Sequence, residues 1–181
     1  KESLEEHMRH TSFASMGADM ADINNDAAVD VFVTDMLPQG VRRLNQTTTF
    51  ENWDVYQNKL AWGYYHQFNR NMLHLNTAAG DFMEIGQLSG VEATDWSWGA
   101  LLADLDNDGW RDIYISNGIA HDLTDQDYIN YISNEEVMRS IVTEDGVNYK
   151  ELIDLMPSKR IPNYAYKNVA EGYKFVARAK E

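Results

Sequence analysis

Two short acidic stretches carry the residues best suited to chemistry. Residues 22–30 read DINNDAAVD and residues 104–112 read DLDNDGWRD, so positions 1, 3, 5 and 9 of each stretch carry a side-chain oxygen. Hard cations that bind through several oxygen atoms need such a set, and calcium is the leading candidate. Magnesium is the lesser candidate, because it retains more water and a stricter octahedral geometry. The spacing therefore predicts a pair of calcium-binding loops.

The predicted ligands are four side chains and one backbone carbonyl in each loop. The first set is Asp22, Asn24, Asp26, the Ala28 carbonyl and Asp30. The second set is Asp104, Asp106, Asp108, the Trp110 carbonyl and Asp112. Gly109, at position 6, suits the left-handed turn of such a loop, whereas Ala27 carries a steric penalty at positive φ. We therefore expect the first site to be weaker or slightly reshaped.

An EF-hand and an ordinary polar turn are the alternatives to this type of calcium loop. An EF-hand needs a bidentate Glu at position 12, where this chain has Val33 and Ile115. It also needs flanking helices, whereas DVFV and DIYI favour strands. The second alternative is an ordinary polar turn, since Asp and Asn are good turn formers. Two loops in register, each with its acids at ligand positions, favour calcium over this alternative.

The two loops belong to longer segments that match each other. Residues 16–33 align with residues 98–115 at a constant offset of 82, with Gly, Ala, Asp and Asn coinciding. A second pair, residues 70–85 and 162–177, shares an Asn-flanked hairpin pattern. Repeated hairpins are typical of solenoids and propellers. We expect a mainly β chain, a partial or fragmentary β-propeller of two repeat units of antiparallel hairpins with helical insertions.

A single propeller-type segment, 1–181, is predicted for the whole chain. Repeat unit one spans about 13–92 and carries a helical insertion at about 47–69, whereas unit two spans about 93–179 with an insertion at about 122–157. Propellers close with about four to eight blades. We therefore expect a fragment of a longer propeller, in which the remaining blades or another chain cover the open edges.

Helical periodicity marks both insertions. In the first, Thr48 and Glu51 form a capping box. An aromatic stripe behind it is expected to pack against the sheet, and its members are Trp53, Tyr56, Leu60, Tyr64 and Phe68. In the second insertion, helices are predicted at 124–140, with Thr124 as N-cap, and at 148–156.

The charge balance limits the partners of the chain. Fifteen basic and 29 acidic residues give a net charge of −14, which repels nucleic-acid backbones and anionic membranes and suits cations. The chain has no cysteine, which excludes disulfides and thiolate metal sites. No apolar stretch approaches the roughly 18 residues of a membrane span. We predict no nucleic-acid partner and no membrane span in this segment.

Four segments together resemble the VCBS/FG-GAP repeat proteins of Bacteroidetes-type bacteria, which are related to integrin α-subunit propellers and to proteins with an ASPIC/UnbV module. They are ASMGADMADINNDAAVDVFVTDMLP, RNMLHLNTAAGDF, TDWSWGALLADLDNDGWRDIYISNG and KRIPNYAYKN. The resemblance implies a β-propeller whose calcium loops lie on hairpins within the blades, held by the ligand sets named above. It also implies export, often to the cell surface. Ala27 departs from the pattern, because the family commonly has Gly there.

These observations predict a calcium-binding module that acts in binding or adhesion. The ligand would be a protein or a glycan, and the location extracellular, cell-surface or periplasmic. The alternative is part of a polysaccharide-processing enzyme on a propeller scaffold. We predict no enzyme activity for this chain, since its conspicuous acids are assigned to the cation and no catalytic fingerprint occurs.

Two further groups of side chains are candidate sites. Trp96, Trp98 and Trp110 near a loop favour a glycan ligand, although core packing explains them equally well. His7 and His10 are three residues apart on a predicted helix, as in a metal pair. They lack an evident third ligand, so hydrogen-bonded or surface histidines are the simpler explanation.

Overall fold

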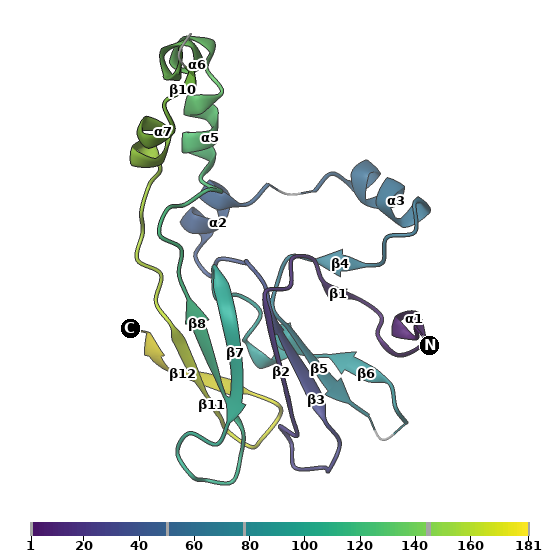
Figure 1. Ribbon diagram of the computed structural model, residues 1–181. Helices are drawn as coiled ribbons and strands as arrows, with labels where there is room; N and C mark the ends of the chain where they lie inside the picture. Colours follow the sequence, from purple (N-terminus) through teal and green to yellow (C-terminus); the bar gives the residue numbers. More distant parts are fainter. Residues whose placement is uncertain (1, 50, 78, 144–145, 181) are drawn as a thin grey trace.

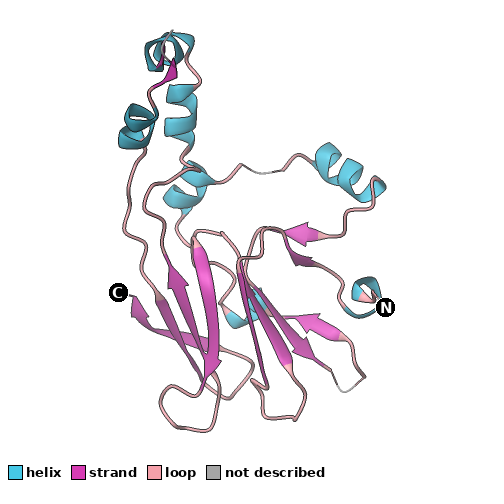
Figure 2. Ribbon diagram, viewed as in Figure 1, coloured by secondary structure: helices cyan, strands magenta, loops and turns pink. Residues whose placement is uncertain are grey.

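Two four-stranded antiparallel sheets form the body of the computed structural model, which describes residues 2–49, 51–77, 79–143 and 146–180 (Figures 1 and 2). The first sheet runs in the order β2 (Gly17–Ala21), β3 (Asp30–Thr34), β5 (Met72–Asn76) and β6 (Phe82–Glu84). The second runs in the order β7 (Ser97–Ala103), β8 (Asp112–Asn117), β11 (Tyr164–Asn168) and β12 (Phe175–Lys180). Short ladders pair β1 (Thr11–Ser12) with β4 (Gln67–Phe68), and β9 (Val142–Thr143) with β10 (Gly146–Val147).

The first strands of the two sheets, β2 and β7, lie side by side (Figure 1). The Asp19 carboxylate of β2 accepts a hydrogen bond from the backbone NH of Leu102 on β7, at 2.7 Å. Gly17 makes the closest approach, because a Cβ at that position would lie 2.3 Å from the Trp98 carbonyl oxygen. Real side chains do not tolerate that distance, so glycine is required where the sheets meet.

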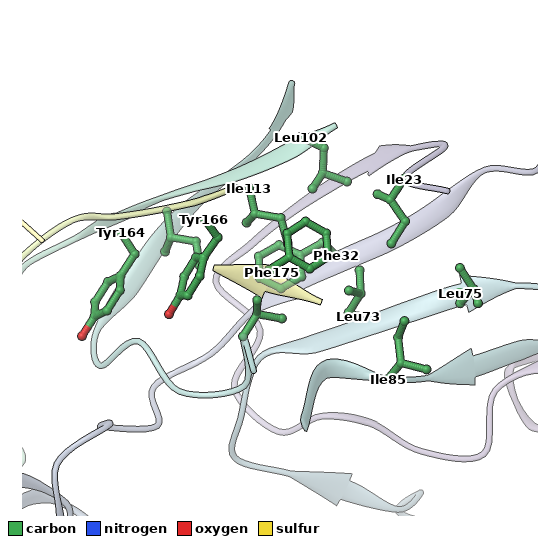
Figure 3. Close-up of a cluster of buried hydrophobic side chains, with 12 residues drawn as sticks. Ile23, Phe32, Leu73, Leu75, Ile85, Leu102, Ile113, Tyr164, Tyr166 and Phe175 are labelled. Carbon is green, nitrogen blue, oxygen red and sulfur yellow. The ribbon is translucent and has the colours of Figure 1, made fainter. Parts of the chain in front are cut away.

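Alternation along the strands builds the core between the sheets. In β3, Phe32 is fully buried while its neighbours are half-buried, as expected for a period of two. Figure 3 shows Phe32 and Leu73 of the first sheet facing Ile113, Tyr166 and Phe175 of the second. Burying one such large apolar side chain contributes about 1.5–3 kcal/mol to folding. The apolar faces of the sheets are thus what holds them together.

The prediction of a mainly β chain was correct only in part. Helices cover 26% of the chain and strands 27%, which is a mixed composition. Within the described ranges no sheet closes on itself, so a propeller remains a prediction. Most of the helical residues lie in the segments that leave the sheets. The prediction from the repeated hairpins gave too little weight to the length of these segments.

The first insertion does not form the predicted helix at 47–69. It forms α2 (Val41–Thr47) and α3 (Trp53–Ala61), and Asn52, not Thr48, caps α3 by accepting from the Asp54 NH at 2.8 Å. Gly63, with φ of 87°, follows the end of α3. No residue of α3 is buried, and α3 lies away from both sheets, so the aromatic stripe does not pack as expected (Figure 1).

The second insertion forms two helices where the sequence predicted one at 124–140. The helix predicted at 124–140 divides into α5 (Gln126–Ile132) and α6 (Glu135–Ile141). Asp125 caps α5 in place of Thr124, and Asn134 starts α6. The third predicted helix is present as α7 (Tyr149–Leu155), with Asn148 as its cap. The remaining short helices are α1 (Leu4–His7) and α4 (Gly86–Ser89) among the described residues.

One buried ion-pair cluster anchors both insertions to the sheets. Arg43 on α2 is 8% exposed, and its guanidinium pairs with Asp95, before β7, and with Asp122, before α5. The two carboxylates raise the pKa of Arg43, although burial alone would lower it. A buried guanidinium needs such partners, because an unpaired charge in the interior is costly. The cluster therefore fixes the positions at which the chain leaves the sheets to form the two insertions.

Candidate metal centre

Both predicted calcium loops connect the first two strands of their sheet. Loop one, residues 22–30, joins β2 to β3, and loop two, residues 104–112, joins β7 to β8. They project from the same end of the two sheets, at the bottom of Figure 1. A hydrogen bond from the Asn25 amide to the Gly109 carbonyl, at 3.1 Å, connects them. The structure therefore brings the two sequence-predicted sites together.

The first aspartate of each loop organises the turn that follows it. In loop one, the Asp22 carboxylate accepts from the backbone NH groups of positions 5 and 6, at 3.1 and 2.8 Å. In loop two, the Asp104 carboxylate accepts from the same two positions at 3.0 and 2.9 Å. Asp26 and Asp108 each accept from the NH two residues later, at 2.8 and 3.0 Å. The two loops thus share one hydrogen-bond pattern, offset by 82 residues.

The last aspartate of each loop is buried and joins the loop to the third strand of its sheet. Asp30 accepts from the backbone NH groups of Ile23 and Asn76, at 2.9 and 2.8 Å. Asp112 accepts from the NH of Asn168 at 2.9 Å in the same way. Burial raises the pKa of Asp30 more than these hydrogen bonds lower it. A carboxylate has about four lone-pair directions, so these hydrogen bonds leave lone pairs of Asp30 and Asp112 unused.

The alanine at position 6 does not reshape loop one. Ala27 adopts φ of 69°, close to the 89° of Gly109 in loop two. The preceding residues match as well, with φ of 59° at Asn25 and 60° at Asn107. The backbone therefore keeps the same left-handed turn, and the expected reshaping is not seen. The penalty for a non-glycine residue at positive φ, about 1 kcal/mol, remains in the energy of loop one.

A lysine that the sequence pattern did not reveal lies beside loop two. Asp104, Asp106 and Asp108 each bring one carboxylate oxygen within 4.8 Å of the other two. The Lys167 ammonium of β11 pairs with Asp106 and, at 2.8 Å, with Asp108. Its hydrogen bond to Asp106 is the main cause that raises the pKa of Lys167, and its hydrogen bond to Asp108 lowers the pKa of that carboxyl.

Loop one has a different internal partner. The Asn24 amide donates to Asp26 at 2.9 Å, where loop two has carboxylates and the ammonium of Lys167. Loop one therefore offers fewer negative charges but no competing cation among its described partners. The predicted ligand atoms in both loops are all oxygens. This set fits a hard cation and not a metal that prefers thiolate or imidazole ligands.

The other predicted candidates lie elsewhere. Trp96 and Trp98 are at the start of β7, with ring centroids 6.4 Å apart, and the Trp98 indole NH donates to the Gly118 carbonyl. Trp110 follows the far end of the same strand, in loop two. The predicted cluster of three tryptophans is therefore wrong, since a strand of seven residues separates its members.

His7 and His10 each lie beside a carboxylate, in agreement with the simpler explanation. His7 is a surface residue 3.5 Å from the Asp81 carboxylate, and His10 is hydrogen-bonded to Glu84 at 3.2 Å. Arg70 also pairs with Glu84, at 3.1 Å. Within the described ranges, these histidines join no group of three metal-ligating side chains.

Comparisons with models of known protein families, with curated proteins and with solved structures gave no match. Among the helices that the structure describes, none combines the length and apolar character needed to cross a membrane.

Proposed function

We propose that the chain is a calcium-binding repeat module of an exported protein, related to the VCBS/FG-GAP proteins that its sequence resembles. The observation that carries the proposal is the shared construction of the two loops. Each carries side-chain oxygens at sequence positions 1, 3, 5 and 9. In each, the aspartate at position 1 accepts from the NH groups of positions 5 and 6, and both loops lie at the same end of neighbouring sheets. A chance polar turn does not require the hydrogen bonds of its first aspartate to agree with those of a second loop in this way.

Calcium would act here as a structural ion. Both loops connect the strands β2–β3 and β7–β8, whose faces form the core, so an ion that joins positions 1, 3, 5 and 9 would fix the ends of these strands. It would also neutralise carboxylates that otherwise repel one another in a chain of net charge −14. We propose that the bound ions hold the surface around the loops in one conformation, so that this surface can recognise a partner. No chemical step is assigned to the loops.

The affinity expected for such loops suits an environment outside the cell. Extracellular calcium modules bind with dissociation constants of about 10⁻⁴–10⁻³ M. At ten times the dissociation constant, one site adds about 1.4 kcal/mol to the free energy of unfolding, and two independent sites add about 2.8 kcal/mol. For a chain of this size, that corresponds to a rise in melting temperature of about 6–11 °C.

Thermal melts test the proposal. Chelator-treated protein is compared in EDTA and in 10 mM calcium chloride, together with Asp26→Asn in loop one and Asp106→Asn in loop two. Each variant is expected to lose about half of the calcium-dependent rise. Asp154→Asn, an exposed carboxylate on α7, is the matched control and should retain all of it. Equal melting temperatures in EDTA and calcium for the unmodified chain would refute the proposal.

A further inference from the structure

We infer that the groove between loop one and the β11–β12 turn is a binding site for a neutral saccharide. This inference deepens the proposed function, and the calcium dependence of saccharide binding rests on that function. The groove has a volume of about 440 Å³, within the range of about 300–1,000 Å³ that ligand sites occupy. Three segments line it. They contribute Asn24 and Asp26 from loop one, Trp110 from loop two, and Tyr173 from the turn.

The floor and walls of the groove are held in place by hydrogen bonds between the two sheets. Asn168, which is buried at the end of β11, donates to the backbone carbonyls of Ile23 at 2.8 Å and Arg111 at 3.1 Å. The bond from Asn25 to Gly109 joins the rims of the two loops. A site fixed before the ligand arrives loses less conformational entropy on binding. The groove is thus prepared for a small rigid ligand.

Two aromatic rings supply the surface that a sugar ring requires. Trp110 is partly exposed, and Tyr173 is 41% exposed at the tip of its turn. Neither ring is stacked on another aromatic ring within the described part of the chain. A pyranose could therefore stack its C–H face on these rings without displacing another aromatic ring, and the Tyr173 hydroxyl and Trp110 indole NH can bond to its hydroxyl groups.

The electrostatics select a neutral ligand. Asp26 lines the groove and no basic side chain does among the residues that the structure describes, so phosphate, sulfate and uronate groups would be repelled. Amide, carboxylate and phenol groups together offer donors and acceptors, which a sugar hydroxyl can use in both senses. A strand-like peptide is less suited, because it binds along the edge of a strand, whereas this groove is lined mainly by loop and turn residues, with only Asn168 and Phe175 from strand ends.

Calcium connects the proposed function to this groove. Asn24 and Asp26 are predicted ligands of loop one and also form one wall, so an ion in loop one would fix the position of that wall. Saccharide binding is therefore expected to weaken when calcium is removed. The aromatic contacts themselves need no ion, so the two ideas can fail separately.

The test uses the full 181-residue chain on an array of immobilised neutral oligosaccharides, ending in glucose, galactose, mannose, fucose or N-acetylhexosamine, in 5 mM calcium chloride. Trp110→Ala and Tyr173→Ala are each expected to weaken binding at least tenfold. Trp62→Ala and Tyr64→Ala are matched controls on exposed aromatic rings just after α3, and should bind as the unmodified chain does. Two independent aromatic variants keep the test decisive even if one of them folds poorly.

The outcomes separate the inference from the proposed function. No binding to any neutral oligosaccharide at millimolar concentration, binding to acidic glycans or peptides only, or equal losses in the α3 controls would overturn the saccharide site. If calcium still stabilises the unmodified chain and Tyr173→Ala in thermal melts, the proposed function stands without the saccharide site. If saccharide binding depends on Trp110 and Tyr173 but calcium has no effect, the groove stands and the proposed function fails.

Discussion

Replacing Gly17 by alanine should force the two sheets apart at their closest contact. The new Cβ would lie 2.3 Å from the Trp98 carbonyl oxygen, which belongs to the backbone of β7 and cannot rotate away. Overpacking of this kind costs about 1–3 kcal/mol. One kcal/mol corresponds to about 2–4 °C in a chain of this size, so Gly17→Ala should lower the melting temperature by about 2–12 °C.

The chain contains its own control for this substitution. Gly99 occupies the corresponding place in the second sheet, and it pairs with Ser116 as Gly17 pairs with Thr34. A Cβ at Gly99 would lie 2.7 Å from the Ser116 hydroxyl, which can rotate, and 3.9 Å from the Ser116 Cβ, which is an ordinary contact. Gly99→Ala should therefore change the free energy of unfolding in urea by less than about 1 kcal/mol. Equal losses for the two variants would refute the packing of β2 against β7.

Two further predictions concern charge. Lys167→Met should tighten calcium binding at loop two several-fold in isothermal titration, because the ammonium that pairs with Asp106 and Asp108 no longer competes with the ion. Lys150→Met, at an exposed lysine, is the control. An unchanged affinity in Lys167→Met would contradict this competition. Burial lowers the pKa of His74 below 6.5 in the folded chain, so the free energy of unfolding should fall as the pH drops below 6.5. The total loss is about 1.4 kcal/mol for each pH unit by which folding lowers this pKa. Thermal melts at pH 7.5 and 5.5 should show a smaller loss for His74→Leu than for the unmodified chain, and equal losses would exclude His74 as the cause.

Local patterns in the sequence were sufficient for the loops and their strands. The acids at alternating positions, the glycine or alanine at position 6 and the β-branched residues that follow are all contained within about 15 residues, so spacing and propensity determine them. The offset of 82 residues between matching segments also appears in the hydrogen bonds of Asp22 and Asp104. Loop construction was thus accessible before the structure was known.

Contacts between distant segments were not accessible in the same way. Lys167 reaches Asp106 across 61 residues, and Arg43 reaches Asp122 across 79, so neither pair follows from local spacing. The helix predicted at 47–69 was wrong because Asn52 offers a better cap than Thr48. The groove beside Tyr173 was missed because three separate segments form it. Its one local signal was Trp110, next to an acidic loop.

Electron density from crystals grown in millimolar calcium chloride would test the central idea most directly. We expect one strong peak in each acidic loop, ringed by the side-chain oxygens at positions 1, 3, 5 and 9 and the carbonyl oxygen at position 7, with the Lys167 ammonium displaced from its aspartates. Bends that keep their present hydrogen bonds, with no ion in either, would contradict it.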